Sequence, residues 1–151
     1  MFKPTSIYSQ NKRLSHLDDS PEWSEAILLM LECNLFTQIP IKLTFLCPKL
    51  QVLNMNNNLI EILDFSIFSN LSELREIHLT GNKIFKIIES KINLPSMIVL
   101  KLNKNKLTDI NDFKFMINLE ILNLSDNYIE NVDTSTFLVS CVPPSVLQLY
   151  L

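Results

Sequence analysis

An asparagine that returns every 22 to 24 residues organises this chain. Aligned on that residue, five segments share the same spacing of leucine-type side chains, at residues 26–36, 50–60, 74–84, 97–107 and 119–129. A repeat of this length forms one structural unit, which buries its apolar side only by stacking on its neighbours. The spacing therefore predicts a solenoid of stacked repeats. The asparagines are Asn34, Asn58, Asn82, Asn105 and Asn127, separated by 24, 24, 23 and 22 residues.

Each copy contains a short stretch in which apolar and other residues alternate, as at Leu53 and Met55 or Leu100 and Leu102. This period of two predicts a strand that points its leucines into one interior and their neighbours outward. Parallel stacking of the strands requires a return path on the far side of each repeat. We expect the asparagine amides to replace lost backbone partners where each strand ends, which would form a ladder along the solenoid.

The segments LQVLNMNNNLI at residues 50–60 and LEILNLSDNYI at 119–129 resemble the LxxLxLxxNxL pattern of the leucine-rich-repeat family. The first copy is the weakest, because Ala26 and Phe36 occupy leucine positions. The resemblance implies an α/β solenoid, curved, with a parallel β-sheet on the concave face and irregular or short helical returns on the convex side. The family pattern also places a second apolar column in the convex half of the core, at Phe68, Ile92, Phe115 and Phe137.

The chain divides into an N-terminal segment, residues 1–25, and a leucine-rich-repeat domain, residues 26–151. Ser20 followed by Pro21 predicts the start of a short capping helix over the first strand, with Ser20 as the N-cap. The domain holds five repeats and an incomplete sixth, because residues 144–151 match the first eight positions of a repeat whose asparagine would fall at 152. We expect this last strand to be an exposed edge that self-associates or pairs with a partner, unless the chain is a piece of a longer array.

The compartment is less constrained by the sequence than the fold. Residues 58–71 resemble the 24-residue repeats of extracellular recognition proteins, whereas residues 106–127 resemble the 22-residue repeats of cytosolic and nuclear adaptors. The N-terminus lacks the apolar run of a secretory signal, and no apolar run is long enough to span a membrane. The three cysteines contain no CxxC pair, which favours free thiols, with a Cys33–Cys47 disulfide as the alternative. We expect a cytoplasmic protein, or an extracellular one if the chain is a fragment.

The outward residues of the strands are the candidate binding face, since the family binds its partners there. A net charge of −3 supplies no positive field for nucleic acid or anionic lipid, so we expect a protein partner and neither nucleic acid nor membrane. The predicted function is a non-catalytic adaptor or scaffold; the alternatives are a regulatory subunit of an enzyme such as a phosphatase and a truncated recognition ectodomain. The predicted partner-binding residues are Asn54, Asn56, His78, Thr80, Lys101, Asn103, Lys104, Asn123, Ser125 and Tyr150.

Catalysis and cofactors find little support in the residues. Only His16 and His78 are available as histidines, and Gly81 is the sole glycine, which excludes a glycine-rich phosphate loop. We therefore expect no catalytic residue, no metal and no cofactor. One basic cluster is predicted, either as a solvated surface or as a dock for an acidic partner or a phosphopeptide. It contains Lys83, Lys86, Lys101, Lys104 and Lys106.

Overall fold

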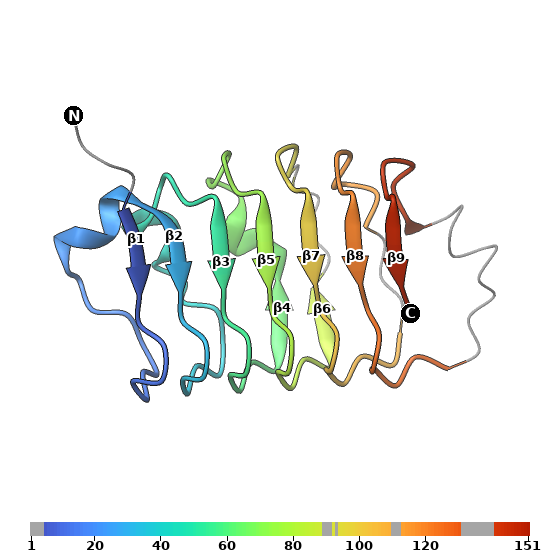
Figure 1. The fold of residues 1–151 in the computed structure, drawn as a ribbon, viewed down its shortest axis with the longest axis horizontal. Coiled ribbons are helices and arrows are strands. Elements are labelled where there is room, and N and C mark those ends of the chain that lie inside the picture. The colour runs from blue at the N-terminus through green and yellow to red at the C-terminus, as the bar shows by residue number, and fades with distance from the viewer. Residues whose placement is uncertain (1–4, 89–91, 93, 110–112, 131–140) are drawn as a thin grey trace.

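A seven-stranded parallel sheet forms one side of the molecule in the computed structural model, which describes residues 5–151 except 89–91, 93, 110–112 and 131–140. Its strands lie side by side in the order β1-β2-β3-β5-β7-β8-β9 (Figure 1). Each turn of the chain thus adds one strand, which confirms the predicted solenoid. The strands are β1 Thr5–Tyr8, β2 Ala26–Met30, β3 Val52–Asn54, β5 Glu76–His78, β7 Val99–Lys101, β8 Ile121–Asn123 and β9 Gln148–Tyr150.

The strands pair so that equivalent positions of successive repeats face one another. Leu53 is opposite Leu29 on one side and Ile77 on the other, and the same column continues through Leu100 and Leu122. All five of these side chains are fully buried. Parallel pairing in this register stacks the leucines into one continuous apolar interior, which supplies most of the driving force for folding.

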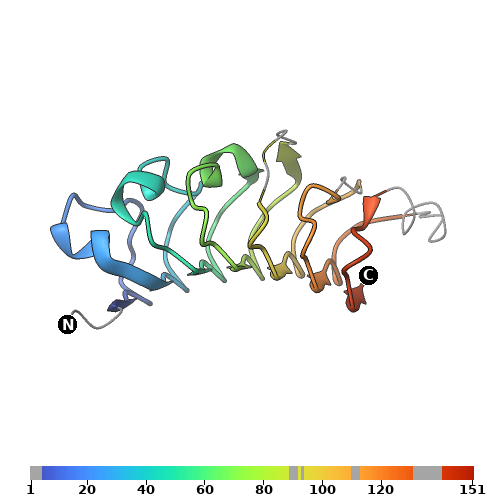
Figure 2. The same cartoon turned by 90° about the horizontal axis from the view of Figure 1, so that it is seen from above.

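The other side of the solenoid is built from irregular returns, short helices and a small second sheet. Figure 2 shows the large sheet along one side and the returns along the other. The strands β4 (Ile62–Asp64) and β6 (Lys86–Ile88) pair in parallel with each other. This second sheet was not predicted, because three residues of alternation are too short to recognise. The helices are the 3-10 helix η1 Pro21–Glu25, the α-helix α1 Leu43–Leu46 and the 3-10 helix η2 Phe65–Phe68.

The predicted convex column is only partly confirmed. Phe68 is fully buried and packs against Phe65, with ring centroids 6.2 Å apart. Phe115 is only partly buried, although its ring meets the Phe65 ring at 5.4 Å, and the buried phenylalanine of this repeat is Phe113. Ile92 is also only partly buried, and Phe137 lies outside the described residues. The return paths are therefore less regular than the strands.

The asparagine ladder is present as predicted. The Asn82 Oδ1 atom accepts a hydrogen bond from the Ile60 N–H at 3.1 Å, and its Nδ2 donates to the carbonyls of Met55 and Leu79 at 2.9 and 3.1 Å. Each amide therefore closes its own turn and also binds the turn before it. Equivalent hydrogen bonds are made by Asn34, Asn58, Asn105 and Asn127.

The N-terminal segment contributes a strand that was not predicted. Strand β1 pairs in parallel with β2, and Ser9 and Lys12 occupy the positions that leucine and asparagine hold elsewhere. Those two replacements hid the repeat from sequence analysis. The turn still closes, because the Asn34 Oδ1 atom accepts from the backbone N–H groups of Lys12 and Leu14.

The predicted helix start at Pro21 is confirmed, but its proposed role is wrong. Helix η1 contacts α1 on the return side, and Ser20 makes no side-chain capping hydrogen bond. The first strand of the repeat region, β2, is covered by β1 instead of by a helix. A strand can supply the backbone partners that the edge of β2 requires, which a helix cannot.

The predicted register of the last strand is also wrong, by two residues. Leu149 is opposite Leu122, in the position expected for Leu147, and Leu147 is 79% exposed. Leu147, Leu149 and Leu151 alternate, so the sequence offers two registers with the same faces buried. The observed pairing places Leu149, 27 residues after Leu122, in the buried column.

Two cysteines occupy contrasting environments. Cys33 is exposed in a left-handed turn, with φ of 56°, whereas Cys47 is fully buried below α1. Both are free thiols, as the favoured interpretation of the sequence expected, and they form no disulfide. Burial raises the pKa of the Cys47 thiol to about 11, because the apolar surroundings disfavour the thiolate.

Replacing Asn82 by alanine should lower the free energy of unfolding by about 3 kcal/mol, because three hydrogen bonds are lost and the Ile60 N–H is left buried without an acceptor. Urea denaturation followed by circular dichroism would measure this. The matched control is Asn118→Ala, an exposed asparagine with one hydrogen bond, to the Pro95 carbonyl, for which we expect a loss below about 1 kcal/mol. Equal losses in the two variants would contradict the ladder's role.

Iodoacetamide should alkylate Cys33 in the native protein and spare Cys47. The reactive species is the thiolate, and a folded-state pKa of about 11 keeps Cys47 protonated throughout the range from pH 7 to about 9. Mass spectrometry of labelled peptides would show this contrast, and it should disappear in urea, where both thiols are exposed. Rapid labelling of Cys47 in the native protein at pH 8 would contradict the burial of its side chain.

Candidate functional site on the outer face of the sheet

The outer face is the side of the large sheet that points away from the leucine columns. Strand alternation places three rows of side chains on it, each running across the strands. The first row is Leu28, Val52, Glu76, Val99, Ile121 and Gln148; the middle row is Tyr8, Met30, Asn54, His78, Lys101, Asn123 and Tyr150; the third row is Glu32, Asn56, Thr80, Asn103 and Ser125.

The structure brings the predicted binding residues together on this face. Eight of the ten lie in the middle and third rows as expected. Lys104 follows the third row in a left-handed turn, with φ of 57°, also as expected. Tyr150 pairs with Asn123 in the middle row, and its predicted place beside Ser125 was wrong because of the register of β9.

The left-handed turn after the third row has the same conformation in successive repeats. Cys33, Asn57 and Asp126 adopt it with φ between 54° and 56°, and Gly81 adopts it with φ of 71°. At Gly81 a Cβ atom would collide with the Asn57 Oδ1 atom of the preceding repeat. The only glycine of the chain therefore stands where two neighbouring turns approach most closely.

Hydrogen bonds between neighbouring strands hold the polar side chains of the outer face. The Asn54 Nδ2 atom donates to the Glu32 carboxylate at 2.7 Å, and the Thr80 hydroxyl donates to the Asn103 Oδ1 atom at 2.8 Å. The Asn56 Oδ1 atom accepts from the Thr80 N–H at 2.7 Å. Because these groups are already ordered, contacts with a partner would lose little additional side-chain entropy.

Charged side chains of both signs, Glu76 and Lys101, lie near the centre of the face. The His78 Nε2 atom lies 2.9 Å from a Glu76 carboxylate oxygen on the same strand, and Lys101 is the next residue across the middle row. At the C-terminal end, the Ser125 hydroxyl donates to the Asn123 Oδ1 atom at 2.8 Å. The face therefore presents directional polar groups without a single dominant charge.

Sequence analysis missed the apolar part of the face. Leu28, Val52, Val99 and Ile121 form most of the first row, and Tyr8 of β1 is 58% exposed beside Met30. The same alternation predicts the first row, because each of its residues precedes a middle-row residue by two positions in the same strand, as Val52 precedes Asn54. Tyr8 was missed because β1 itself was missed.

The predicted basic cluster loses Lys86 to the return side. Lys101 lies on the outer face, whereas Lys86 belongs to β6 on the return side (Figure 1). Lys83, Lys104 and Lys106 are exposed in the turns that follow the strands. Lys83 and Lys106 directly follow Asn82 and Asn105, so they hold equivalent positions in adjacent repeats, whereas β6 takes Lys86 to the return side.

Metal-binding clusters and membrane-spanning helices are absent from the described residues. These residues contain no group of three or more histidine, cysteine, aspartate or glutamate side chains placed to hold a metal ion. None of their helices has the length and apolar character needed to cross a membrane.

Comparisons with known proteins agree with this architecture. Two models described as leucine rich repeat match residues 28–84 and 118–141. Mouse (Mus musculus) keratocan is 28% identical over an alignment that covers 98% of this chain and 48% of keratocan. Bovine (Bos taurus) osteomodulin is 33% identical over 62% of this chain and 22% of osteomodulin. The chain thus spans about half of the first relative and about a fifth of the second.

Solved structures show the same fold at low sequence identity. YopM from Yersinia enterocolitica superposes with a TM-score of 0.69 at 22% identity, over 95% of this chain and 28% of YopM. An internalin from Listeria monocytogenes superposes with a TM-score of 0.55 at 20% identity, over 90% of this chain and 44% of the internalin. These likenesses concern the fold alone.

Proposed function

Because the chain belongs to the leucine-rich-repeat family, we propose that it is a non-catalytic adaptor or scaffold that holds a protein partner against the outer face of its sheet. Proteins of this family generally mediate protein–protein interactions and are typically not enzymes. The observation that carries the proposal is the composition of the face, in which apolar side chains from β2, β3, β7 and β8 lie beside rows of ordered polar side chains.

The dimensions of the face favour a macromolecular partner. Seven strands at roughly 4.8 Å spacing extend the face over about 30 Å. A small molecule would contact only a fraction of such an open surface, since ligand sites for small molecules are concave and enclosed. A protein surface can cover the three rows at once.

The two kinds of row support different parts of recognition. Leu28, Val52 and Ile121 offer apolar contact area, and the aromatic rings of Tyr8 and Tyr150 stand at opposite ends of the middle row. Tyrosine is enriched among residues that dominate binding energies. The asparagine and threonine side chains of the third row supply hydrogen bonds of fixed direction, which discriminate between partners.

The triple substitution His78→Ala, Lys101→Ala and Asn123→Ala should weaken partner binding at least tenfold, because it removes polar contacts from the centre of the face. A pulldown under reducing conditions, followed by titration of the captured partner, would measure the change. The control combines His16→Ala, Lys86→Ala and Asn118→Ala, the same residue types at exposed positions off the face. Unchanged binding of the His78, Lys101 and Asn123 triple variant would contradict the proposal.

Tyr8→Ala should weaken binding of the same partner roughly tenfold, because the proposed interface includes this exposed ring at the N-terminal end of the face. Tyr128→Ala is the matched control, because Tyr128 is 64% exposed in a turn and lies in none of the three rows. Circular dichroism would show that both variants are folded. Equal effects of the two substitutions would show that the N-terminal tyrosine has no special part in binding.

A further inference from the structure

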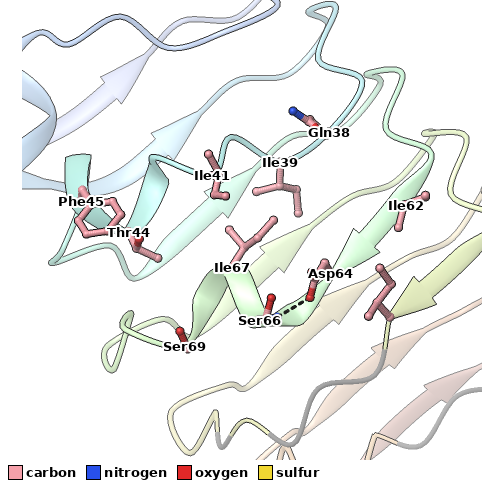
Figure 3. Close-up of a pocket in the computed structure, with 11 residues that line it drawn as sticks. Gln38, Ile39, Ile41, Thr44, Phe45, Ile62, Asp64, Ser66, Ile67 and Ser69 are labelled. Carbon is pink, nitrogen blue, oxygen red and sulfur yellow. Dashed lines mark hydrogen bonds between the residues drawn. The ribbon is translucent and has the colours of Figure 1, made fainter.

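A second apolar surface lies on the return side of the solenoid, away from the outer face. It is a groove of about 530 Å³ lined by the segment 38–45, by the strand β4 with the helix η2 that follows it, and by Ile88 of β6 (Figure 3). Its volume falls within the range of sites that bind ligands. No part of the proposed function uses this groove.

Large apolar side chains surround the groove and remain exposed. Ile41 is 74% exposed and Phe45 is 80% exposed on one side, and Ile62 is 41% exposed on the other. Ile39, only 2% exposed, lies between them, and Figure 3 shows Ile67 directed into the same space. Single exposed apolar residues are ordinary, but several around one hollow indicate a surface that is covered by something.

The strand β4 leaves one of its edges open toward this groove. Its other edge is paired with β6, and the Glu61 carbonyl accepts from the Phe85 N–H at 3.0 Å on that side. Because successive peptide groups of a strand point to opposite sides, the Ile62 peptide groups face the groove. Among the described residues, the single backbone hydrogen bond that joins segment 37–46 to segment 61–68 is that from the Glu61 N–H to the Thr37 carbonyl.

The charge around the groove has one sign. Asp64 is the only ionisable side chain among its lining residues, and its Oδ1 atom accepts from the Ser66 N–H at 2.9 Å. Lys42 does not line the groove, and its Nζ atom forms an ion pair with the Asp19 Oδ1 atom at 2.7 Å. A bound segment that placed a lysine or arginine beside Asp64 would therefore meet an opposite charge.

We propose that this groove binds an extended, apolar and basic segment of a partner protein, which adds as a strand to the open edge of β4. The main chain of the segment would hydrogen-bond the Ile62 peptide groups, and its alternate apolar side chains would cover the exposed side chains of Ile41 and Phe45. Strand addition of this kind obtains affinity from the backbone and specificity from the pockets beside it. Three residues of β4 would pair with a stretch of about 10 Å.

The test is selection from a random heptapeptide library displayed on phage, with the whole chain as the immobilised target. We expect the enriched peptides to alternate apolar residues and to carry lysine or arginine. Ile41→Asp should weaken the binding of a selected synthetic peptide at least tenfold. Asp64→Asn keeps the oxygen that caps η2 and removes the charge. It should therefore weaken the binding of basic peptides several-fold and leave the binding of their uncharged variants unchanged.

Two control variants test whether peptide binding belongs to this groove. Ile117→Asp, at an apolar side chain 57% exposed on a different repeat, should not affect the peptide, nor should the triple alanine variant of the outer face. Hydrogen exchange should show protection of the Ile62 amide on peptide binding. Failure to enrich any peptide, selection of acidic peptides, or insensitivity to Ile41→Asp would overturn the proposal. A dimer of this chain that Ile41→Asp dissociates would overturn it in favour of a second copy as the occupant.

Discussion

The structure depends on the amide of one asparagine after each of the strands β2, β3, β5, β7 and β8. At that point the backbone leaves the sheet and its polar groups lose their ladder partners, so a side chain must replace them. The Asn58 amide bonds the Leu31 and Met55 carbonyls and the Phe36 N–H, and so ties two successive turns together. Because five successive repeats are tied in this way, their strands stack in one register and the leucine columns align.

The outer face is a consequence of that register. Once Leu53, Ile77 and Leu100 are opposite one another in the interior, the residues between them form rows on the other side. Hydrogen bonds such as that from Thr80 to Asn103 can then connect neighbouring repeats along a row. The same stacking on the return side, where the returns differ in sequence, leaves the open edge of β4 and the groove beside it. The two proposed surfaces thus follow from regular strands on one side and irregular returns on the other.

Sequence analysis succeeded where the pattern was complete and failed where single residues broke it. The sheet strands and asparagines of the middle repeats were predicted because leucine and asparagine occupy their usual positions, whereas the small sheet of β4 and β6 was not. Strand β1 was missed because Ser9 and Lys12 replace those residues, yet the amide of Asn34 in the following repeat closes the turn. The register of β9 was misjudged because alternation alone fits Leu147 as well as Leu149, and only the length of the preceding return distinguishes them.

By itself, the sequence determined the stacked repeat, the buried leucines, the asparagine ladder and the rows in which the central polar residues lie. These features follow from periodicity, since apolar side chains spaced by two and by about 24 residues can share one interior in only one way. Only the tertiary structure showed that Tyr8 lies on the outer face and that Lys86 lies on the return side. It also showed that β4 pairs through one edge and leaves the other unpaired. Those outcomes depend on how neighbouring returns pack against each other, which involves contacts between unlike segments that no repeating pattern encodes.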